Sequence, residues 1–534
     1  MKRLLLLLLC IALLLTVTGC GKPTANSAEL SVAEAALKSD FVCDDNYRVF
    51  YEIFVGSFSD SDGDGIGDLR GIINRMDYLN DGDPNSGRSL GVEGLWLTPI
   101  FVSPSYHKYD VSDYYSIDPA FGTMDDLKEL LELCHERNVK VILDLVINHT
   151  SSKIPWFINF RTAQQTGNTA SKYYDYYSHC SDGEQIPGCS YAKLPGTNQY
   201  YECNFWDQMP ELNYDNPSVR TAMLDVAKFY LDLGVDGFRF DAIKYIYFND
   251  HNANAEFWQW YMDELRAYKP DIYTVGECWD ADGVTDLYYP ALNCFDFTAS
   301  QSGGLFAETA QHGDVDRLTS YVDRYLERVE GLRSDAMLVP FLSNHDMDRS
   351  AGYLTVASGN MKVAANLYLL CPGSPFLYYG EELGLRGSRG GSDTDANRRL
   401  AMLWGDGDKV SNPEGATYQA AKQIETTVQD QIADKNSLYT YYKTLLMIRH
   451  ANPEIARGEY TPLVFSDDRL GGFLSTWDGS TVCVIHNTTL RTITVDLREV
   501  TDLPLSLSSV IGMEDAQIDG TMLTVGGQTS VVLR

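Results

Sequence analysis

The sequence has few basic residues for its length, with 42 Lys and Arg against 74 Asp and Glu and a net charge of −32. General nucleic-acid binding needs clustered positive charge that replaces the counterions around phosphates, so this balance excludes it, and acidic polymers are poor partners for the same reason. The 44% hydrophobic content excludes wholesale disorder. At 534 residues the chain is long enough for one large barrel with additions or for roughly two to four domains.

Beyond its first twenty residues the chain lacks any uninterrupted apolar run of about 18 residues, the length that a membrane-spanning helix needs. The first twenty begin with two basic residues and continue with an apolar run over 4–15, which predicts an export signal over residues 1–19. Val17-Thr-Gly-Cys20 resembles a bacterial lipoprotein cleavage box. This implies a lipid on Cys20, a linker over 20–40 and a place on the surface of a bacterium. The alternative is an ordinary secretory signal and a secreted soluble protein.

Cysteine is scarce and unevenly placed. Nine cysteines follow Cys20, an odd number that cannot all pair within one chain, and none forms the close CxxC pairs of a zinc site. Cys180, Cys189 and Cys203 lie in a polar stretch where an exported protein could form one disulfide. One disulfide and three free thiols are both open at this point.

Between residues 48 and 450, short apolar runs alternate with amphipathic stretches. Eight runs have the character of strands, at residues 49–55, 94–99, 139–146, 237–241, 272–276, 294–297, 337–342 and 376–379. Helical periodicity marks residues 124–137, 218–233, 256–267, 315–329, 362–370 and 441–450. Strands that alternate with helices over more than about 250 residues predict an α/β protein with a (β/α)8 TIM barrel.

Two segments depart from the alternation. Residues 151–206 are rich in Tyr, Ser, Gly and Asn without helical periodicity, which predicts a subdomain inserted after the third strand. From residue 456 to 534, Thr, Val and Leu recur at strand spacing, which predicts a C-terminal antiparallel β-sandwich domain. The barrel is then expected to comprise residues 41–150 and 207–455.

Polar residues end four of the expected strands, and active sites of such barrels form at the carboxyl ends of the strands. These residues are Asn148 and His149 after the third strand, Arg239 and Asp241 at the fourth, Glu277 after the fifth, and Asn344, His345 and Asp346 after the seventh. Each alone could be a helix cap or a structural residue. Four strand ends of one barrel converge on one cavity, so we expect a single catalytic site there.

Three carboxylates beside two histidines and an arginine suit retaining glycoside hydrolysis. That reaction needs one ionised carboxylate that attacks the anomeric carbon and one carboxylic acid that protonates the leaving oxygen, about 5–5.5 Å apart. Asp241 suits the first role because Arg239, two residues earlier, is expected to lower its pKa. Glu277 suits the second because the negative charge of Asp241 or Asp346 raises its pKa.

The remaining strand-end residues suit sugar binding. His149 and His345 are expected to hydrogen-bond sugar hydroxyls. Asp346 is expected to bind two adjacent hydroxyls and so to favour ring distortion toward the oxocarbenium-like transition state.

The segments around these residues resemble the four hallmark segments of the α-amylase family of retaining glycoside hydrolases, glycoside hydrolase family 13. They read DLVINH at 144–149, GFRFDAIK at 237–244, GECW at 276–279 and FLSNHD at 341–346. Three further segments match, GLWLTP at 94–99, MPELN at 209–213 and GSPFLYYGEE at 373–382. The resemblance implies Asp241 as nucleophile, Glu277 as acid and base, and Asp346 as transition-state stabiliser. It also implies that Tyr109 stacks on the sugar with His107 nearby.

Carrying the same motifs over implies substrate contacts for Lys244, Asn344 and Arg239. Ala242, after the nucleophile, resembles enzymes that act on α-1,4 bonds, whereas MPELN resembles the group intermediate between oligo-1,6-glucosidases and neopullulanases. We therefore expect a monomeric α-amylase that cleaves internal α-1,4 bonds of starch and maltooligosaccharides. The enzyme alternatives are a neopullulanase, a cyclomaltodextrinase or an α-glucosidase on short α-glucans. The non-enzyme alternative is a catalytically silent starch-binding lipoprotein, which the intact carboxylate trio argues against.

An acidic loop after the first expected strand suits Ca²⁺, because carboxylates alternating with glycines let one tight turn direct several oxygens at a hard cation. The candidate ligands are the carboxylates of Asp60, Asp62, Asp64 and Asp68 and the carbonyl of Ile66. An EF-hand is not expected because Gly71 stands where the bidentate Glu belongs. In relatives that resemble oligo-1,6-glucosidases and neopullulanase-like amylases, such a loop after the first strand binds calcium, and a metal-free acidic turn is the alternative. A second calcium site near Asn148 stays open, since Tyr245 stands where the best-known α-amylases have a histidine ligand.

Overall fold

A computed structural model of the chain describes residues 37–390 and 394–534. The expected export signal, Cys20 and most of the linker over 20–40 lie outside the described residues. Among the described residues, no helix is long and apolar enough to cross a membrane.

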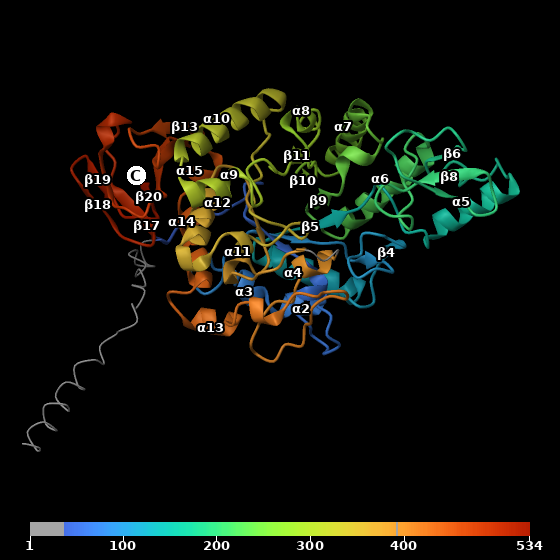
Figure 1. Cartoon of the computed structure of the whole chain (residues 1–534), viewed down its shortest axis with the longest axis horizontal. Coiled ribbons are helices and arrows are strands. Elements are labelled where there is room, and N and C mark those ends of the chain that lie inside the picture. Colours follow the sequence, from blue (N-terminus) through green and yellow to red (C-terminus); the bar gives the residue numbers. More distant parts are fainter. Residues whose placement is uncertain (1–36, 391–393) are drawn as a thin grey trace, which may run out of the picture.

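Seven parallel strands form a curled sheet at the centre of the molecule (Figure 1). In spatial order they are β11 (Asn293–Cys294), β10 (Tyr273–Gly276), β9 (Gly237–Phe240), β5 (Lys140–Leu145), β2 (Gly94–Leu97), β1 (Phe50–Ile53) and β12 (Phe376–Tyr378). Each pairs in parallel with its neighbours. Strands β1, β2, β9 and β10 are buried along their whole length, as expected for a parallel sheet covered on both faces. The arrangement confirms the predicted barrel fold.

The structure corrects the prediction at the seventh strand, residues 337–342. Among the described residues its one ladder pairing is an isolated bridge from Phe341 to β12. Pro340 has no N–H to donate, and this interrupts the ladder. The carbonyls of Leu338 and Val339 still accept backbone N–H groups from the two flanking segments, so this irregular segment closes the ring.

Helices cover the outside of the sheet (Figure 1). They are α2 (Leu69–Asn74), α3 (Met76–Leu79), α4 (Met124–Glu136), α6 (Pro217–Asp232), α7 (His251–Tyr268), α8 (Asp282–Thr285), α9 (Leu305–His312), α10 (Val315–Leu332), α11 (Ser350–Tyr353), α12 (Asn360–Leu369), α13 (Val428–Ala433) and α14 (Leu438–Ala451). Every helix predicted from periodicity is among them. Caps fix their ends: Thr123 and Asp126 form a capping box at α4, and Asp250 accepts the N–H of Ala253 where α7 begins.

Two excursions follow strands of the barrel. After β2, the hairpin of β3 (Phe101–Val102) and β4 (Asp113–Ile117) carries the loop that contains Tyr109. After β5, the chain forms α5 (Pro155–Thr166) and the antiparallel sheet of β6 (His179–Ser181), β8 (Gln199–Glu202) and β7 (Tyr191–Lys193). In this excursion Cys180, Cys189 and Cys203 are free thiols.

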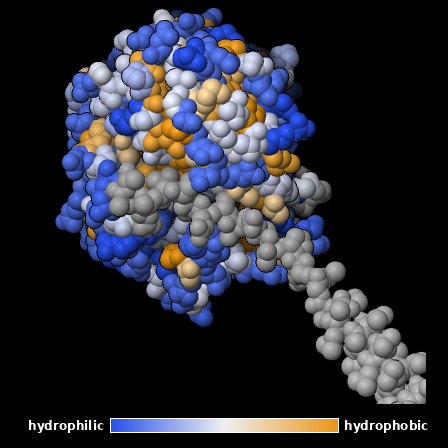
Figure 2. Space-filling view, turned by 90° about the vertical axis from the view of Figure 1, so that its left-hand side faces the viewer, coloured by the Kyte–Doolittle hydropathy of each residue, from blue (hydrophilic) through white to orange (hydrophobic). Residues whose placement is uncertain are grey.

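Two antiparallel sheets follow α15 (Glu454–Arg457) and lie at the end of the molecule away from α5 (Figure 1). The larger contains β13 (Glu459–Val464), β14 (Leu470–Trp477), β15 (Ser480–Asn487), β20 (Thr529–Leu533) and β17 (Leu507–Gly512). The smaller contains β16 (Ile493–Asp496), β19 (Met522–Val525) and β18 (Ala516–Asp519). Leu470, Ile485, Leu523 and Val531 are part of one core between them. The face at this end is largely hydrophilic, with hydrophobic residues in small groups (Figure 2).

Candidate active site

The residues that follow β5, β9, β10 and segment 337–342 meet at one cavity of about 520 Å³. Six of the predicted site residues line it: Asp241, Glu277, Asp346, His107, Tyr109 and His149. The other lining residues are Tyr106, Phe205, Trp206, Met209, Thr394, Asp395 and Arg399. Carboxyl ends of neighbouring strands therefore bring the expected catalytic trio together.

Arg239 joins the carboxylates of Asp241 and Glu277, the predicted catalytic pair, and is fully buried. Its Nη1 lies 2.7 Å from Oδ1 of Asp144 and 2.7 Å from Oδ1 of Asp241, while Nη2 lies 2.9 Å from Oε2 of Glu277. The carboxylates of Asp241 and Glu277 thus contact the two terminal nitrogens of one planar guanidinium. Asp241 and Glu277 are therefore neighbours, as two carboxylates that act on one glycosidic bond must be.

The turn after β9 adds a second contact to Glu277. Ala242 has a left-handed backbone, with φ 48° and ψ 45°, which is uncommon for a residue other than glycine. This conformation lets the N–H of Ala242 donate to Oε2 of Glu277 at 3.1 Å. Glu277 is thus fixed both by a guanidinium and by a backbone N–H.

Burial is the largest influence on the pKa values of Asp241 and Glu277. It raises the pKa of Asp241 to about 6 although Arg239 acts to lower it, and the charge of Asp144 adds to the rise. It raises the pKa of Glu277 to about 7, again against Arg239, with the charges of Asp241 and Asp346 adding to the rise. The predicted lowering by Arg239 is present but smaller than the effect of burial, so the net shift for Asp241 is upward. Glu277 still keeps its proton to a higher pH than Asp241.

Asp346 has the opposite balance. Burial would raise its pKa, but the charge and hydrogen bond of His345, followed by the charge of Arg399, hold that pKa well below its usual range. Oδ2 of Asp346 lies 3.0 Å from Nε2 of His345, and Oδ1 lies 2.7 Å from Nη2 of Arg399. Asp346 is therefore an anion over the whole neutral range.

Three of the predicted sugar-facing residues, Tyr109, His107 and His149, have uncharged rings at pH 7. The ring of Tyr109 is stacked on that of His345 with centroids 5.4 Å apart, and its hydroxyl donates to Asp144 at 2.7 Å. Burial lowers the pKa of His107 and of His149 to about 4, so both rings are neutral at pH 7. Nε2 of His149 is buried and has no hydrogen-bond partner among the described residues. Its capacity for a hydrogen bond is therefore unused in the structure.

Four predicted substrate-binding residues do not line the cavity: Arg239, Lys244, Asn344 and His345. Oδ1 of Asn344 accepts the N–H of Asp346 at 2.9 Å. Lys244 forms an ion pair with Asp280 at 2.8 Å. His345 is fully buried behind Asp346. In the structure these side chains contact protein groups around the cavity.

Two buried residues of the site were not predicted from the sequence. Arg399, in the loop after β12, pairs with Asp346 and donates to the hydroxyl of Tyr106 at 3.0 Å. Glu52, on β1, is 1% exposed, and its Oε1 lies 2.6 Å from Nδ1 of His345. A charged residue inside the apolar run of β1 was the available signal for Glu52. No pattern in the sequence marks Arg399.

The acidic loop after β1 brings three of its five predicted ligands together. Carboxylate oxygens of Asp60, Asp62 and Asp68 lie within 4.8 Å of one another. Oδ1 of Asp64 instead accepts the N–H of Ile66 at 2.7 Å. The three clustered carboxylates are oxygen donors of the kind that Ca²⁺ prefers.

At Asn148, where a second calcium site was left open, the structure has a contact between protein groups. Nδ2 of Asn148 donates to Glu211, which also accepts the N–H of Asn204 at 3.0 Å. Glu211 belongs to the MPELN segment, so this contact ties the excursion after β5 to the end of that strand.

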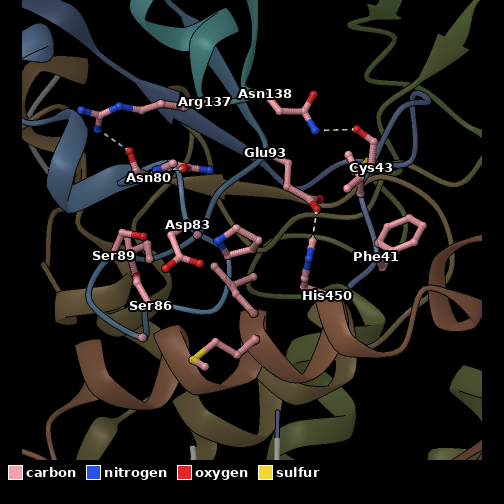
Figure 3. A pocket seen from close by; sticks show the side chains of 18 of the residues that line it. Phe41, Cys43, Asn80, Asp83, Ser86, Ser89, Glu93, Arg137, Asn138 and His450 are labelled. Atoms are coloured by element: carbon pink, nitrogen blue, oxygen red, sulfur yellow. Dashed lines mark hydrogen bonds and ion pairs between the residues drawn. The ribbon is translucent and has the colours of Figure 1, made fainter. Parts of the chain in front are cut away.

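A second cavity, of about 200 Å³, lies at the other end of the barrel (Figure 3). Its lining includes Glu93, directly before β2, Asn138, two residues before β5, and His450 at the end of α14. His450 pairs with Glu93 at 3.1 Å. Phe41 and Cys43, close to the first described residue, complete this wall.

Comparisons with known proteins agree with this geometry. Residues 52–458 match the family described as "Alpha amylase, catalytic domain". The chain is 36% identical over 445 residues to Alpha-amylase 3 of Dictyoglomus thermophilum, which covers 82% of this chain and 84% of that one. It is 30% identical over 525 residues to Oligo-1,6-glucosidase of Parageobacillus thermoglucosidasius, which covers 83% and 90%. Among solved structures, Eubacterium rectale Amy13B superposes with a TM-score of 0.86 at 34% identity, covering 95% of this chain and 99% of that one.

Proposed function

Because the chain belongs to the alpha-amylase family of glycoside hydrolases, whose members act on α-glucans, we propose that it cleaves internal α-1,4 bonds of starch and maltooligosaccharides. The observation that carries the proposal is that one buried guanidinium, that of Arg239, contacts both Asp241 and Glu277. A sugar bound between these two carboxylates would have a nucleophile on one side and an acid on the other.

The reaction follows from the two protonation states. Protonated Glu277 gives its proton to the glycosidic oxygen while ionised Asp241 attacks the anomeric carbon, so the C–O bond breaks and a glycosyl ester forms on Asp241. Glu277, now a carboxylate, takes a proton from the water that hydrolyses this ester. Two displacements at the same carbon retain its configuration. Asp346, held as an anion, stabilises the positive charge that develops on the ring in each step.

The walls of the cavity support a sugar as substrate. Phe205 and Trp206 line it with 47% and 50% of their surfaces exposed, so their flat faces are available for sugar rings. His149 offers an unpartnered ring nitrogen. The family and these contacts together support a neutral polysaccharide, in agreement with a net charge that disfavours polyanions.

The proposed bond specificity is supported by the relatives and by one residue. Alpha-amylase 3 is more similar to this chain than the oligo-1,6-glucosidase is, and Ala242 follows the nucleophile as in enzymes of α-1,4 bonds. The second candidate, an α-glucosidase of the oligo-1,6-glucosidase type, is favoured by the 30% identity to that relative.

Product analysis separates the two candidates. The enzyme should be incubated with amylose, pullulan and isomaltose in parallel, with Asp241→Asn as the control that lacks the nucleophile. We expect a series of maltooligosaccharides from amylose and no glucose from isomaltose. Glucose as the sole early product, together with hydrolysis of isomaltose, would replace the amylase by the α-glucosidase.

We also propose that loop 60–68 binds Ca²⁺ and that the chain is an exported lipoprotein anchored through Cys20. The first is supported by the cluster of Asp60, Asp62 and Asp68. These three carboxylates would hold a structural ion beside the barrel, away from the reacting atoms. The second is supported by the cleavage-box resemblance before Cys20.

A further inference from the structure

Glu52 is a buried carboxylate that neither lines the cavity nor enters the reaction. It lies on β1 with 1% of its surface exposed. Its Oε1 stands 2.6 Å from Nδ1 of His345 and also accepts the backbone N–H of the same residue at 3.4 Å. The imidazole of His345 is itself fully buried. Burying a carboxylate is costly unless it is paired, and the partner here is this histidine.

The other ring nitrogen of His345 also faces oxygen atoms. Nε2 lies 3.0 Å from Oδ2 of Asp346 and 2.6 Å from the hydroxyl of Tyr109. Tyr109 donates its own proton to Asp144 at 2.7 Å, so its oxygen is an acceptor toward His345. Acceptors thus face both nitrogens. A neutral imidazole donates from one nitrogen only, whereas an imidazolium donates from both.

We propose that Glu52 is a positioning residue that holds His345 as an imidazolium, so that Nε2 donates to Asp346 and Tyr109 and fixes both beneath the sugar. The inference rests on the proposed function, in which Asp346 stabilises the transition state. Glu52 touches no substrate and acts through His345 alone.

The electrostatics of the ring agree with this geometry. Burial would lower the pKa of His345, but the charges of Asp346 and Glu52 raise it to about 10. The other charged groups that face this cluster are Asp144 and Arg239, from β5 and β9, and Arg399, from the loop after β12. The two arginines disfavour a cation at position 345. The negative charge of Glu52 helps to offset them.

The test is the variant Glu52→Gln, which keeps the size of the side chain and an acceptor oxygen but removes the charge. Without that charge His345 loses its proton at a lower pH. The ratio of wild-type to variant kcat/KM on maltooligosaccharides should therefore rise about fivefold or more between about pH 5.5 and about pH 8. Thermal melting of both proteins checks that the variant is folded.

Glu382→Gln is the matched control, because Glu382 is another buried glutamate of the barrel and accepts from the hydroxyls of Tyr51 and Tyr78. For this control, the ratio of wild-type to variant kcat/KM should stay constant over the same pH range. In a His345→Asn background, Glu52→Gln should change kcat/KM less than about twofold, because its route of action is already lost.

A ratio that stays flat for Glu52→Gln, or an effect that adds fully to that of His345→Asn, would overturn the inference. Both outcomes require wild-type protein that hydrolyses α-glucans. A wild-type protein with no such activity would contradict the proposed function instead, so the two failures are distinguishable.

Discussion

Asp241 and Glu277 share one guanidinium but differ in their pKa, and this difference sets a working pH range. The reaction needs Asp241 without a proton and Glu277 with one. Since burial raises the two pKa values to about 6 and about 7, kcat/KM should be highest between these values. It should fall at lower pH as Asp241 takes up a proton, and at higher pH as Glu277 loses one. Initial rates on a maltooligosaccharide across the pH range check both limbs, and a profile without an alkaline limb would contradict the role of Glu277.

Glu277→Gln isolates the acid step. Glutamine keeps the size and can still meet Arg239, but it has no proton to give, so hydrolysis of maltooligosaccharides should fall by about 10²–10⁴-fold. A maltosyl fluoride is the control substrate, because fluoride leaves without a proton. Formation of the glycosyl ester from it should be impaired much less. Equal losses on both substrates would mean that Glu277 is not the acid.

We expect the planar guanidinium geometry of Arg399, and not its positive charge alone, to be needed for activity. It contacts Asp346, the hydroxyl of Tyr106 and the carbonyl of His345, which lysine cannot reach together. Arg399→Lys should therefore lower kcat by roughly tenfold or more in steady-state assays. Arg70→Lys is the control, since Arg70 pairs with exposed Glu129 at the surface and should keep wild-type rates. Wild-type rates for Arg399→Lys would show that a cation suffices.

The meeting of Asp241, Glu277 and Asp346 at one cavity could be predicted from the sequence, because each stands at the end of an apolar run. Their partners could not. Glu52 and His345 are 293 positions apart, and no periodicity relates them. The predicted direction of the Asp241 pKa shift was wrong. Burial is its largest cause, and the degree of burial depends on all the residues packed around the site and not on the neighbour Arg239 alone.

Elements were predictable where hydrophobic pattern and hydrogen bonding agree. Helices satisfy their own backbone hydrogen bonds, so their formation depends little on distant segments. Each of the six segments with helical periodicity is accordingly a helix in the structure. Segment 337–342 has the apolar pattern of a strand, but Pro340 breaks its ladder, and whether the ring closes without regular pairing depends on the flanking segments.

The acidic loop holds a second segment of chain against the barrel. The carbonyl of Gly65 accepts the N–H and the hydroxyl of Ser411, and Asp408 accepts the N–H of Asp60 at 3.1 Å. This segment begins nine residues after Arg399 in the same irregular stretch of chain. An ion that fixes the loop should therefore stabilise the wall of the active site as well as the fold.

Removal of Ca²⁺ with a chelator should lower Tm by roughly 3 °C or more, and added Ca²⁺ should restore it, because an ion that binds the folded state stabilises it. Without any chelator, Asp62→Asn should already have the lower Tm of the chelator-treated wild type, and added chelator should not change it further. Asp478→Asn, at an exposed hairpin turn, is the control and should respond as the wild type does. A chelator response that persists in Asp62→Asn would place the ion elsewhere.

At the scale of the whole molecule, the two ends of the barrel face in opposite directions. The active site lies at the carboxyl ends of the strands, whereas Phe41 and Cys43 line the cavity at their amino ends (Figure 3). The described chain thus starts on the side away from the active site. If Cys20 carries a lipid, the anchored segment joins the described part of the chain on this side of the barrel.

Cys20→Ser tests this anchor. If Cys20 carries the lipid, the wild type should partition into the detergent phase and into membranes, and the variant should move to the aqueous phase, because a lipid anchor depends on buried methylene groups. Its kcat/KM on soluble maltooligosaccharides should equal that of the wild type, because the cavity is built by residues at the other end of the barrel. Cys10→Ser is the matched control, since position 10 lies within the predicted signal and should not alter partitioning. A Cys20→Ser protein that stays with the membrane would exclude lipid on Cys20 as the anchor, whereas an aqueous wild type would favour the secreted soluble form.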